Sequence, residues 1–286
     1  MNKSFFLLLA FLVPNALICQ EKIDKELLKK DLDVLKSNLE TYHTGLNTYT
    51  SKQDLDRWFT ETKDNLQDAT PLDFFKKVVE LNELIKNGHT FFHINPAQRG
   101  ENLLMPSFTI YEDKAQFYVK SVQSKEYSGI IGKRIISINE VPIEEVFEAL
   151  LVYEERDGNN TTQPKEELLF SFARKYALEY GNSEQTRIEI EENGKSKLIN
   201  LPNVAFGEEV QKTDELFDNG GVYSTVKDSI ATLTIETFNE VALKKTGYKS
   251  KLKAFFTSVK NNNVKHLIID VRNKLSLRVQ LSAISD

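Results

Sequence analysis

The spacing of apolar residues predicts that the chain begins, after a short leader, with a group of helices. Between residues 22 and 43 the apolar positions recur every three or four residues, the period of an amphipathic helix: Ile23, Leu27, Leu28, Leu32, Leu35, Leu39 and Tyr42. Thr50–Ser51 and Thr70–Pro71 are start signals for two more helices, and Gly88 is a stop signal for the last one. We therefore predict a three-helix bundle over residues 22–100, with His89 directly after its last helix.

From about residue 103 the period changes from 3.6 to 2. Alternating polar and apolar residues predict strands near 107–110, 116–122, 134–139, 186–191 and 197–201. Pro142 and Pro164 each open a helix between these strands, and Asn193–Gly194 is a strong signal for a two-residue hairpin turn. Residues 103–203 are thus predicted to form a β domain with a helical insertion.

The last part of the chain has the order hairpin, helix, strand. After an acidic linker and a short hairpin, a helix leads to the apolar run within 264–273, which predicts a strand buried on both faces, as in the centre of a parallel sheet. This order implies a parallel strand pair and the beginning of an α/β domain over 218–286. Catalytic loops in open α/β sheets gather at the carboxyl ends of such strands. The polar residues at that place are Asp270, Arg272 and Asn273.

Composition narrows the class of protein. The 286 residues are 40% hydrophobic and 28% charged, as in ordinary soluble proteins, and the net charge of −5 leaves no basic stripe for nucleic acid. Lys3 followed by the apolar run 5–13 is typical of a signal peptide, here residues 1–19, so we expect export to the periplasm or the extracellular space. An uncleaved anchor and a lipid on Cys19 are the alternatives. No second apolar stretch approaches spanning length, so no stable membrane span is expected in the mature chain.

Three segments taken together resemble one family. Asn87–Thr90 follows the helical bundle, Gly132–Ile143 looks like the core strand and helix of a PDZ-like domain, and Leu267–Asn273 looks like the start of an Asp-Leu-Arg-x-Asn-x-Gly-Gly segment. Their order resembles the C-terminal processing (tail-specific) and tricorn-like serine peptidases. The resemblance implies an α+β multidomain fold: a helical N-terminal domain, a PDZ-like domain and an incomplete α/β, crotonase-like peptidase core.

The resemblance also implies roles for particular residues. His89 matches the general base that takes a proton from a serine nucleophile, and Asp270, Arg272 and Asn273 match the edge of the oxyanion loop. The PDZ-like segment would bind the C-terminal segments of peptides or proteins, at residues that the sequence does not assign. Neither a metal nor an organic cofactor is implied.

The chain departs from the family after Asn273. The glycines of the family segment are missing, because residues 274–286 contain no glycine, and nothing in the sequence frames Ser276, Ser282 or Ser285 as a nucleophile. We therefore expect a product truncated or frame-shifted before the catalytic serine, and inactive as given; whether it is an enzyme stays open. The alternatives are a secreted, non-catalytic peptide-binding (PDZ-like) protein and a fragment without function.

Plainer interpretations stand beside these. His89 also fits a polar residue after a helix C-terminus, where partial negative charge favours an imidazolium. His89 and His93 have the spacing of a zinc pair on a helix, but Gly88 ends the helix, and along an extended chain they would be about 13 Å apart. No metal site is predicted, and His43 and His266 receive no role.

Two charged groups also have structural interpretations. Asp270 and Arg272 fit ion pairs at a sheet edge. The run Glu154, Glu155 and Asp157 precedes a polar loop and is expected at a solvated surface.

Overall fold

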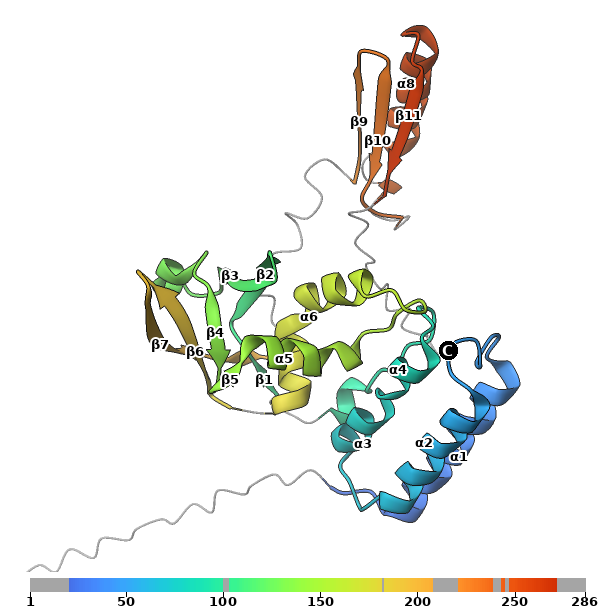
Figure 1. The fold of residues 1–286 in the computed structure, drawn as a ribbon, viewed down its shortest axis with the longest axis vertical. Helices are drawn as coiled ribbons and strands as arrows, with labels where there is room; N and C mark the ends of the chain where they lie inside the picture. Colours follow the sequence, from blue (N-terminus) through green and yellow to red (C-terminus); the bar gives the residue numbers. More distant parts are fainter. Residues whose placement is uncertain are drawn as a thin grey trace, which may run out of the picture. The chain divides into compact units, whose positions relative to one another are not determined.

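A computed structural model of the chain describes residues 21–99, 103–181, 183–207, 221–238, 243–244 and 247–271 (Figure 1). These residues form a mixed α/β fold with several small sheets. The chain divides into two compact units, residues 1–210 and 211–286.

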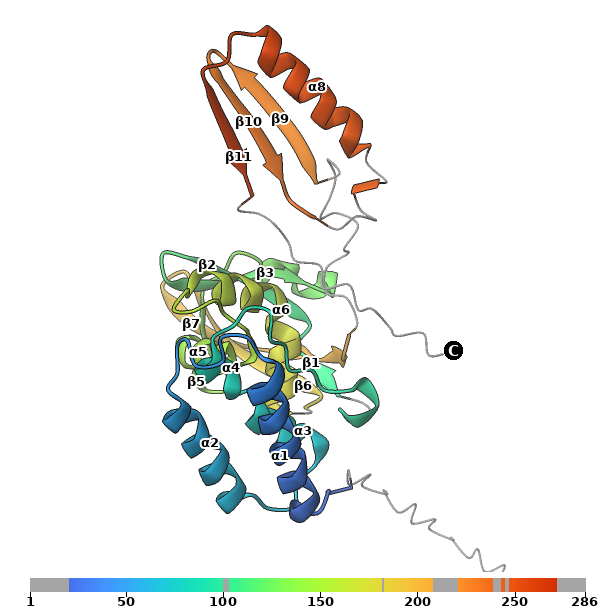
Figure 2. The ribbon, with the colours of Figure 1, turned by 90° about the vertical axis from the view of Figure 1, so that its right-hand side faces the viewer.

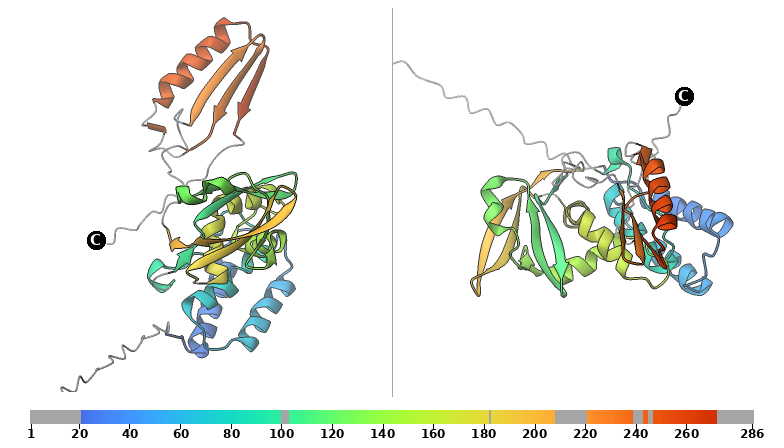
Figure 3. Two further views of the ribbon diagram at one scale, coloured as in Figure 1. Left: turned by 90° about the vertical axis from the view of Figure 1, so that its left-hand side faces the viewer. Right: turned by 90° about the horizontal axis from the view of Figure 1, so that it is seen from above.

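The first unit begins with helices whose ends the sequence signals set. They are α1 (Lys25–Tyr42), α2 (Lys52–Asn65), α3 (Pro71–Val78) and α4 (Leu81–Ile85), and α1 and α2 lie side by side (Figures 1 and 3). The predicted caps are confirmed, because Ser51 and Thr70 each accept a hydrogen bond from a backbone N–H of the first turn. The buried side chains between the helices are Leu32, Leu39, Leu46, Leu55, Phe59, Leu81 and Ile85.

The prediction of one continuous third helix ended by Gly88 is wrong. The chain tightens after Val78, where the N–H of Asn82 bonds to the carbonyl of Val79, three residues back, instead of four. The helix resumes as α4 and ends at Lys86, which takes the left-handed conformation with φ 49°. The turn that carries His89 therefore begins two residues earlier than the glycine signal indicated.

The remainder of the first unit contains most of the strands. They are β1 (Leu104–Met105), β2 (Phe108–Asp113), β3 (Gln116–Val122), β4 (Ile135–Ile138), β5 (Val141–Pro142), β6 (Gln185–Glu192), β7 (Lys195–Pro202) and β8 (Val204–Ala205). The sheets have the orders β5-β4-β6-β7, β2-β3 and β1-β8. Helices α5 (Ile143–Leu150) and α6 (Thr162–Tyr180) lie between β5 and β6 in the chain. The predicted hairpin is confirmed: Asn193 and Gly194 both have positive φ between the paired strands β6 and β7.

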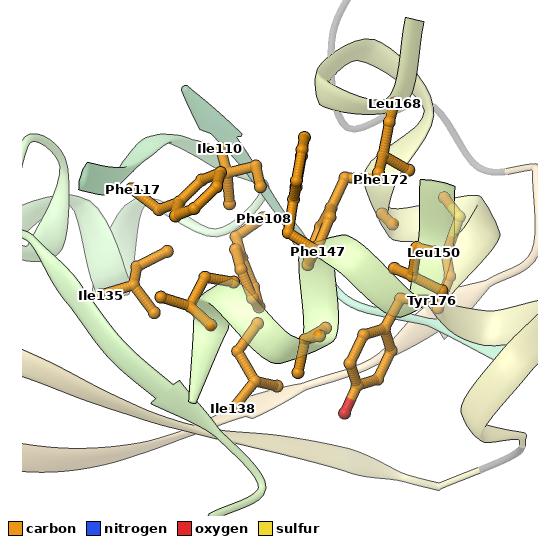
Figure 4. Packing of buried hydrophobic residues seen from close by; sticks show 14 of the residues in the cluster. Phe108, Ile110, Phe117, Ile135, Ile138, Phe147, Leu150, Leu168, Phe172 and Tyr176 are labelled. Atoms are coloured by element: carbon orange, nitrogen blue, oxygen red, sulfur yellow. The ribbon is translucent and has the colours of Figure 1, made fainter. Parts of the chain in front are cut away.

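One apolar core joins the strands to the helices. Figure 4 shows Phe108 of β2, Phe147 of α5 and Phe172 of α6 packed together, and each is at most 3% exposed. Val79, at the end of α3, belongs to the same cluster. Asn82 of α4 is also buried, and its side-chain amide donates to the carbonyl of Val152 at 2.9 Å. The helical segment and the β segment of this unit therefore share buried contacts.

The sequence predicted that the charged run before the polar loop lies at a solvated surface. This prediction is wrong for Glu154 and Glu155. Glu154 and Glu155 are 2% and 7% exposed. Helix α6 supplies partners for Glu154: Ser171 Oγ donates to its carboxylate at 2.6 Å, and Lys175 Nζ lies 3.5 Å from the same oxygen. A run of charges indicates a surface only when no later segment brings partners to it.

Burial also changes the titration of two tyrosines. Tyr176 of α6 is 5% exposed, and its hydroxyl accepts a hydrogen bond from Asn139 Nδ2 at 2.9 Å. Burial raises the pKa of Tyr176 to about 12. Burial, reinforced by the hydrogen bond to Glu179, raises the pKa of Tyr153 as well.

We expect the first unit to lose stability as the pH rises from about 10, the pKa of tyrosine in an unfolded chain, to about 12. In this window Tyr176 loses its proton in the unfolded state before it does so in the folded state, so deprotonation favours unfolding. Below about pH 10 the stabilising contribution of Tyr176 is fully present. Urea unfolding at pH of about 9 and about 11 should show the parent losing on the order of 1 kcal/mol more than Tyr176→Phe. An equal loss in the two proteins would contradict the assignment.

The described residues of the second unit form a three-stranded sheet with helix α8 packed on it. It contains β9 (Val222–Lys227), β10 (Ile230–Ile235), α8 (Tyr248–Asn261) and β11 (His266–Asp270), and the sheet order is β11-β10-β9. The predicted parallel pair is confirmed, because β10 and β11 run parallel. Figure 2 shows α8 along one face of the sheet, where Phe255 packs on Val222, Ala231 and Leu233.

The prediction that the last strand is buried on both faces is wrong for the described residues. Leu267, Ile268 and Ile269 of β11 are 46%, 49% and 53% exposed. Within the described residues β11 pairs with β10 alone. Helix α8 contacts β9, the strand at the opposite edge of the sheet. The apolar run reflects the β-propensity of its residues. A central strand would also have another strand on its second edge and layers on both faces, and the described residues do not supply these to β11.

Candidate functional site

His89 lies in a tight turn, Asn87–Thr90, directly after α4. The N–H of Thr90 donates to the carbonyl of Asn87 at 3.1 Å. The side-chain Oδ1 of Asn87 accepts two hydrogen bonds, from the N–H of His89 at 2.9 Å and from the hydroxyl of Thr90 at 3.2 Å. This is an Asx-type turn closed by its own asparagine. The imidazole of His89 is exposed and makes no hydrogen bond or ion pair within the described part of the chain.

The polar loop between the 3₁₀ turn η3 (Leu151–Tyr153) and α6 holds this turn from one side. Asp157 Oδ1 accepts a hydrogen bond from the N–H of Gly88 at 2.8 Å. A Cβ at position 88 would lie 2.8 Å from the same oxygen, so the close approach requires glycine. The N–H of Gly158 donates to the carbonyl of Lys86 at 2.9 Å, and Lys86 Nζ donates to Asn159 at 3.0 Å. The loop and the turn are therefore clamped together along their backbones.

The connection between α1 and α2 holds the turn from another side. His43 Nε2 lies 2.9 Å from Thr90 Oγ1, and Thr50 Oγ1 donates to the carbonyl of Leu84 at 2.5 Å. Tyr49 also reaches the loop, because a Cβ at Gly158 would lie 2.7 Å from its ring. Three segments that are far apart in the sequence thus converge on the residue that the sequence singled out.

Two hollows lie in this region, and neither is lined by His89. One, of about 560 Å³, is lined by residues at the end of α1 and the start of α2, including Glu40, His43 and Lys52. The other, of about 380 Å³, is lined by Glu83 and Arg156, which form an ion pair between α4 and the polar loop, and by the first turn of α6. His89 itself is exposed.

As expected from the stop at the end of α4, His89 and His93 do not share a helix. Residues 89–95 have no regular secondary structure, and the ring of His93 stacks on Phe91 with 6.0 Å between the centroids. Among the described residues, no three His, Cys, Asp or Glu side chains are grouped so that they could hold a metal ion.

The other predicted site residues are placed only in part. Asp270 ends β11 in the second unit, whereas His89 belongs to the first. Arg272 and Asn273 lie outside the described residues, as do the serines after position 273 and the predicted signal peptide at 1–19. Among the helices that the structure describes, none combines the length and the apolarity needed to cross a bilayer.

Neither family models nor curated protein sequences give a match to this chain. Among solved structures, a serine-to-alanine mutant of CPAF matches with 12% identity and a TM-score of 0.60. Mature CPAF, alone and complexed with lactacystin, matches with 13% identity and a TM-score of 0.59. Each match covers 87% of this chain and 56% of the CPAF chain.

The chain thus spans about half the length of the CPAF chains that it matches. CPAF is a chlamydial serine protease with a tail-specific protease-like fold. At 12–13% identity the likeness concerns the fold. The chain therefore shares its fold with the matched part of CPAF.

Proposed function

We propose that this chain supplies the general base and the peptide-holding part of a serine endopeptidase of the tail-specific or tricorn-like type, exported to the cell envelope by residues 1–19. The observation that carries the proposal is the position of His89, exposed on a turn that two distant segments hold, in a chain with a CPAF-like fold. The order of the three sequence segments supports the same assignment.

In this role His89 takes the proton of a serine hydroxyl as the oxygen attacks a peptide carbonyl, and then gives the proton to the leaving amine. Both steps require an imidazole nitrogen that no neighbour occupies, and the ring of His89 has no partner within the described residues. Backbone amides near Asp270, Arg272 and Asn273 would bind the oxyanion of the tetrahedral intermediate, a role that rests on the family resemblance.

The peptidase role is tested first on the coding DNA. We expect one of the reading frames beyond the codon for Asn273 to encode a glycine-rich run and a later serine. A chain extended in that frame should react with a fluorophosphonate probe and cleave peptides, and the 286-residue polypeptide alone should do neither. His89→Ala in the extended chain is expected to lower kcat at least about 100-fold, whereas the control His93→Ala leaves it unchanged.

Three outcomes would contradict this account. Labelling of the 286-residue polypeptide would show that the expectation of inactivity is wrong. The absence of such a frame, or unaltered cleavage by His89→Ala, would remove the peptidase role or the role of His89 in it.

The peptide-holding role has its own support and test. Strand β7 ends the described four-stranded sheet, and its Leu198 is 62% exposed, so an extended peptide has an edge to add to. We expect fluorescent peptides with a free C-terminal carboxylate to bind at least about 10-fold more tightly than the same peptides with a C-terminal amide. Equal affinities would argue against capture of C-termini. Selective binding without any serine chemistry would favour the alternative, a secreted peptide-binding protein.

A further inference from the structure

His43 is the residue at which the end of α1 meets the turn of His89. It caps α1, with its N–H bonded to the carbonyl of Leu39, and its half-buried ring reaches a threonine 47 residues later in the chain. The ring nitrogen Nε2 lies 2.9 Å from Thr90 Oγ1. The other ring nitrogen, Nδ1, is buried and has no hydrogen-bond partner within the described residues.

The hydrogen atoms at this contact can be assigned by counting donors. Thr90 has one hydroxyl hydrogen, and its oxygen lies 3.2 Å from Asn87 Oδ1, which only accepts. A hydrogen bond at this contact has one possible direction, from the Thr90 hydroxyl to Asn87 Oδ1. His43 must then donate its own hydrogen from Nε2 to Thr90 Oγ1.

This assignment also suits the other side of the ring. With the hydrogen on Nε2, Nδ1 carries only a lone pair. The opposite tautomer would bury an N–H at Nδ1 without an acceptor among the described residues, which is the less favourable arrangement. Of the two tautomers, the arrangement therefore selects the one with its hydrogen on Nε2.

We propose that His43 is the positioning residue for His89. A relay of hydrogen bonds runs from His43 to Thr90 and from Thr90 to Asn87 Oδ1, which also receives the N–H of His89. Because the ring of His89 has no partner of its own within the described residues, the backbone of the turn decides where the ring points. Without His43, the polar loop alone holds this region within the described residues, through the bond of Gly88 to Asp157 and the bonds of Lys86 to Gly158 and Asn159. The catalytic meaning of this role rests on the proposed function, whereas the relay itself does not.

The tautomer is read directly by NMR of the full chain with ¹⁵N-labelled histidine. Long-range correlations between ring protons and ring nitrogens at neutral pH are expected to show His43 protonated at Nε2 and bare at Nδ1. A proton on Nδ1, or rapid exchange between the two tautomers, would overturn the assignment.

The relay is tested with three variants. His43→Phe keeps a ring but removes the donor, His43→Gln retains a side-chain N–H, and Thr90→Val removes the hydroxyl at similar size. We expect amide hydrogen exchange at His89 and Thr90 to accelerate at least about 10-fold in His43→Phe and Thr90→Val, with the rate largely restored in His43→Gln. Amides of α2 and α6 should not change, and His93→Phe serves as the matched control on the same segment.

The exchange result separates this inference from the proposed function. Unchanged exchange at His89 and Thr90 in both Thr90→Val and His43→Phe would overturn the positioning role and leave the role of His89 as a base untouched. In a chain that cleaves peptides, His43→Phe is expected to lower kcat with KM unchanged, and His43→Gln to recover it. Acceleration throughout the first unit, in place of the turn alone, would show that His43 is merely structural.

Discussion

Replacing Lys175 by methionine is expected to lower the free energy of unfolding of the first unit by about 3 kcal/mol. The reason is the carboxylate that it leaves behind. Glu154 has a side chain that is only 3% exposed, with Lys175 Nζ 3.5 Å away and Ser171 Oγ donating at 2.6 Å. Without the ammonium group, the buried charge of Glu154 keeps, among the described residues, one neutral donor, Ser171 Oγ. Lys175 Nζ also donates to the carbonyl of Tyr153 at 3.0 Å, and this bond is lost as well.

Urea unfolding followed by circular dichroism measures the effect, and two further variants define it. Lys197→Met removes one partner of the exposed pair with Glu192, whose side chains are 54% and 32% exposed, and should cost less than about 1 kcal/mol. The double variant Glu154→Leu with Lys175→Met removes both charges and should recover most of the loss. If Lys175→Met costs no more than Lys197→Met, the Glu154 pair is not the buried pair described here.

The same pair matters for the candidate site. Glu154 precedes the loop in which Asp157 and Gly158 bind the turn of His89. Lys175→Met should therefore accelerate exchange at the amides of Gly88 and Gly158 as well as lowering stability. A sequence interpretation that placed this run of charges in solvent could not anticipate that role.

The features that the sequence predicted well depend on residues close together in the chain. The caps at Ser51 and Thr70 need only the hydrogen-bonding groups of the following turn. The hairpin at Asn193–Gly194 needs only two residues that tolerate positive φ. The parallel pairing of β10 and β11 follows from the helix between them, which carries the chain back to the start of the sheet.

The features that it missed depend on residues far apart. His43 and Asp157 contact the turn of His89 from 47 and 69 residues away, and no local pattern marks either one. His89 itself was singled out through the resemblance of its segment to a peptidase family, because its spacing alone is more typical of a polar residue after a helix. The exposure of β11 was missed for a related reason: an apolar run predicts a strand, but the burial of that strand depends on what packs against it.

Phe172→Ala is expected to destabilise the first unit by about 4 kcal/mol, and the matched substitution Phe170→Ala on the same helix by less than about 1 kcal/mol. Phe172 is 1% exposed, and its ring lies 6.4 Å from that of Phe108 and 5.9 Å from that of Tyr176, measured between centroids. Truncation leaves a cavity among rigid neighbours from β2 and α6 that cannot close around it. Phe170 is 40% exposed, so its removal leaves no enclosed cavity.

The position of the only tryptophan makes this substitution a test of how the first unit is built. Trp58 packs on Phe59 in the helical segment, away from the cluster that contains Phe172. Val79 and Asn82 join the two segments through buried contacts, so we expect Trp58 fluorescence and far-ultraviolet circular dichroism to report the same lowered urea midpoint in Phe172→Ala. A Trp58 transition that stays at the parental midpoint would show that the helices fold independently. In that case the turn of His89 would be carried by a domain that does not need the β segment for its stability.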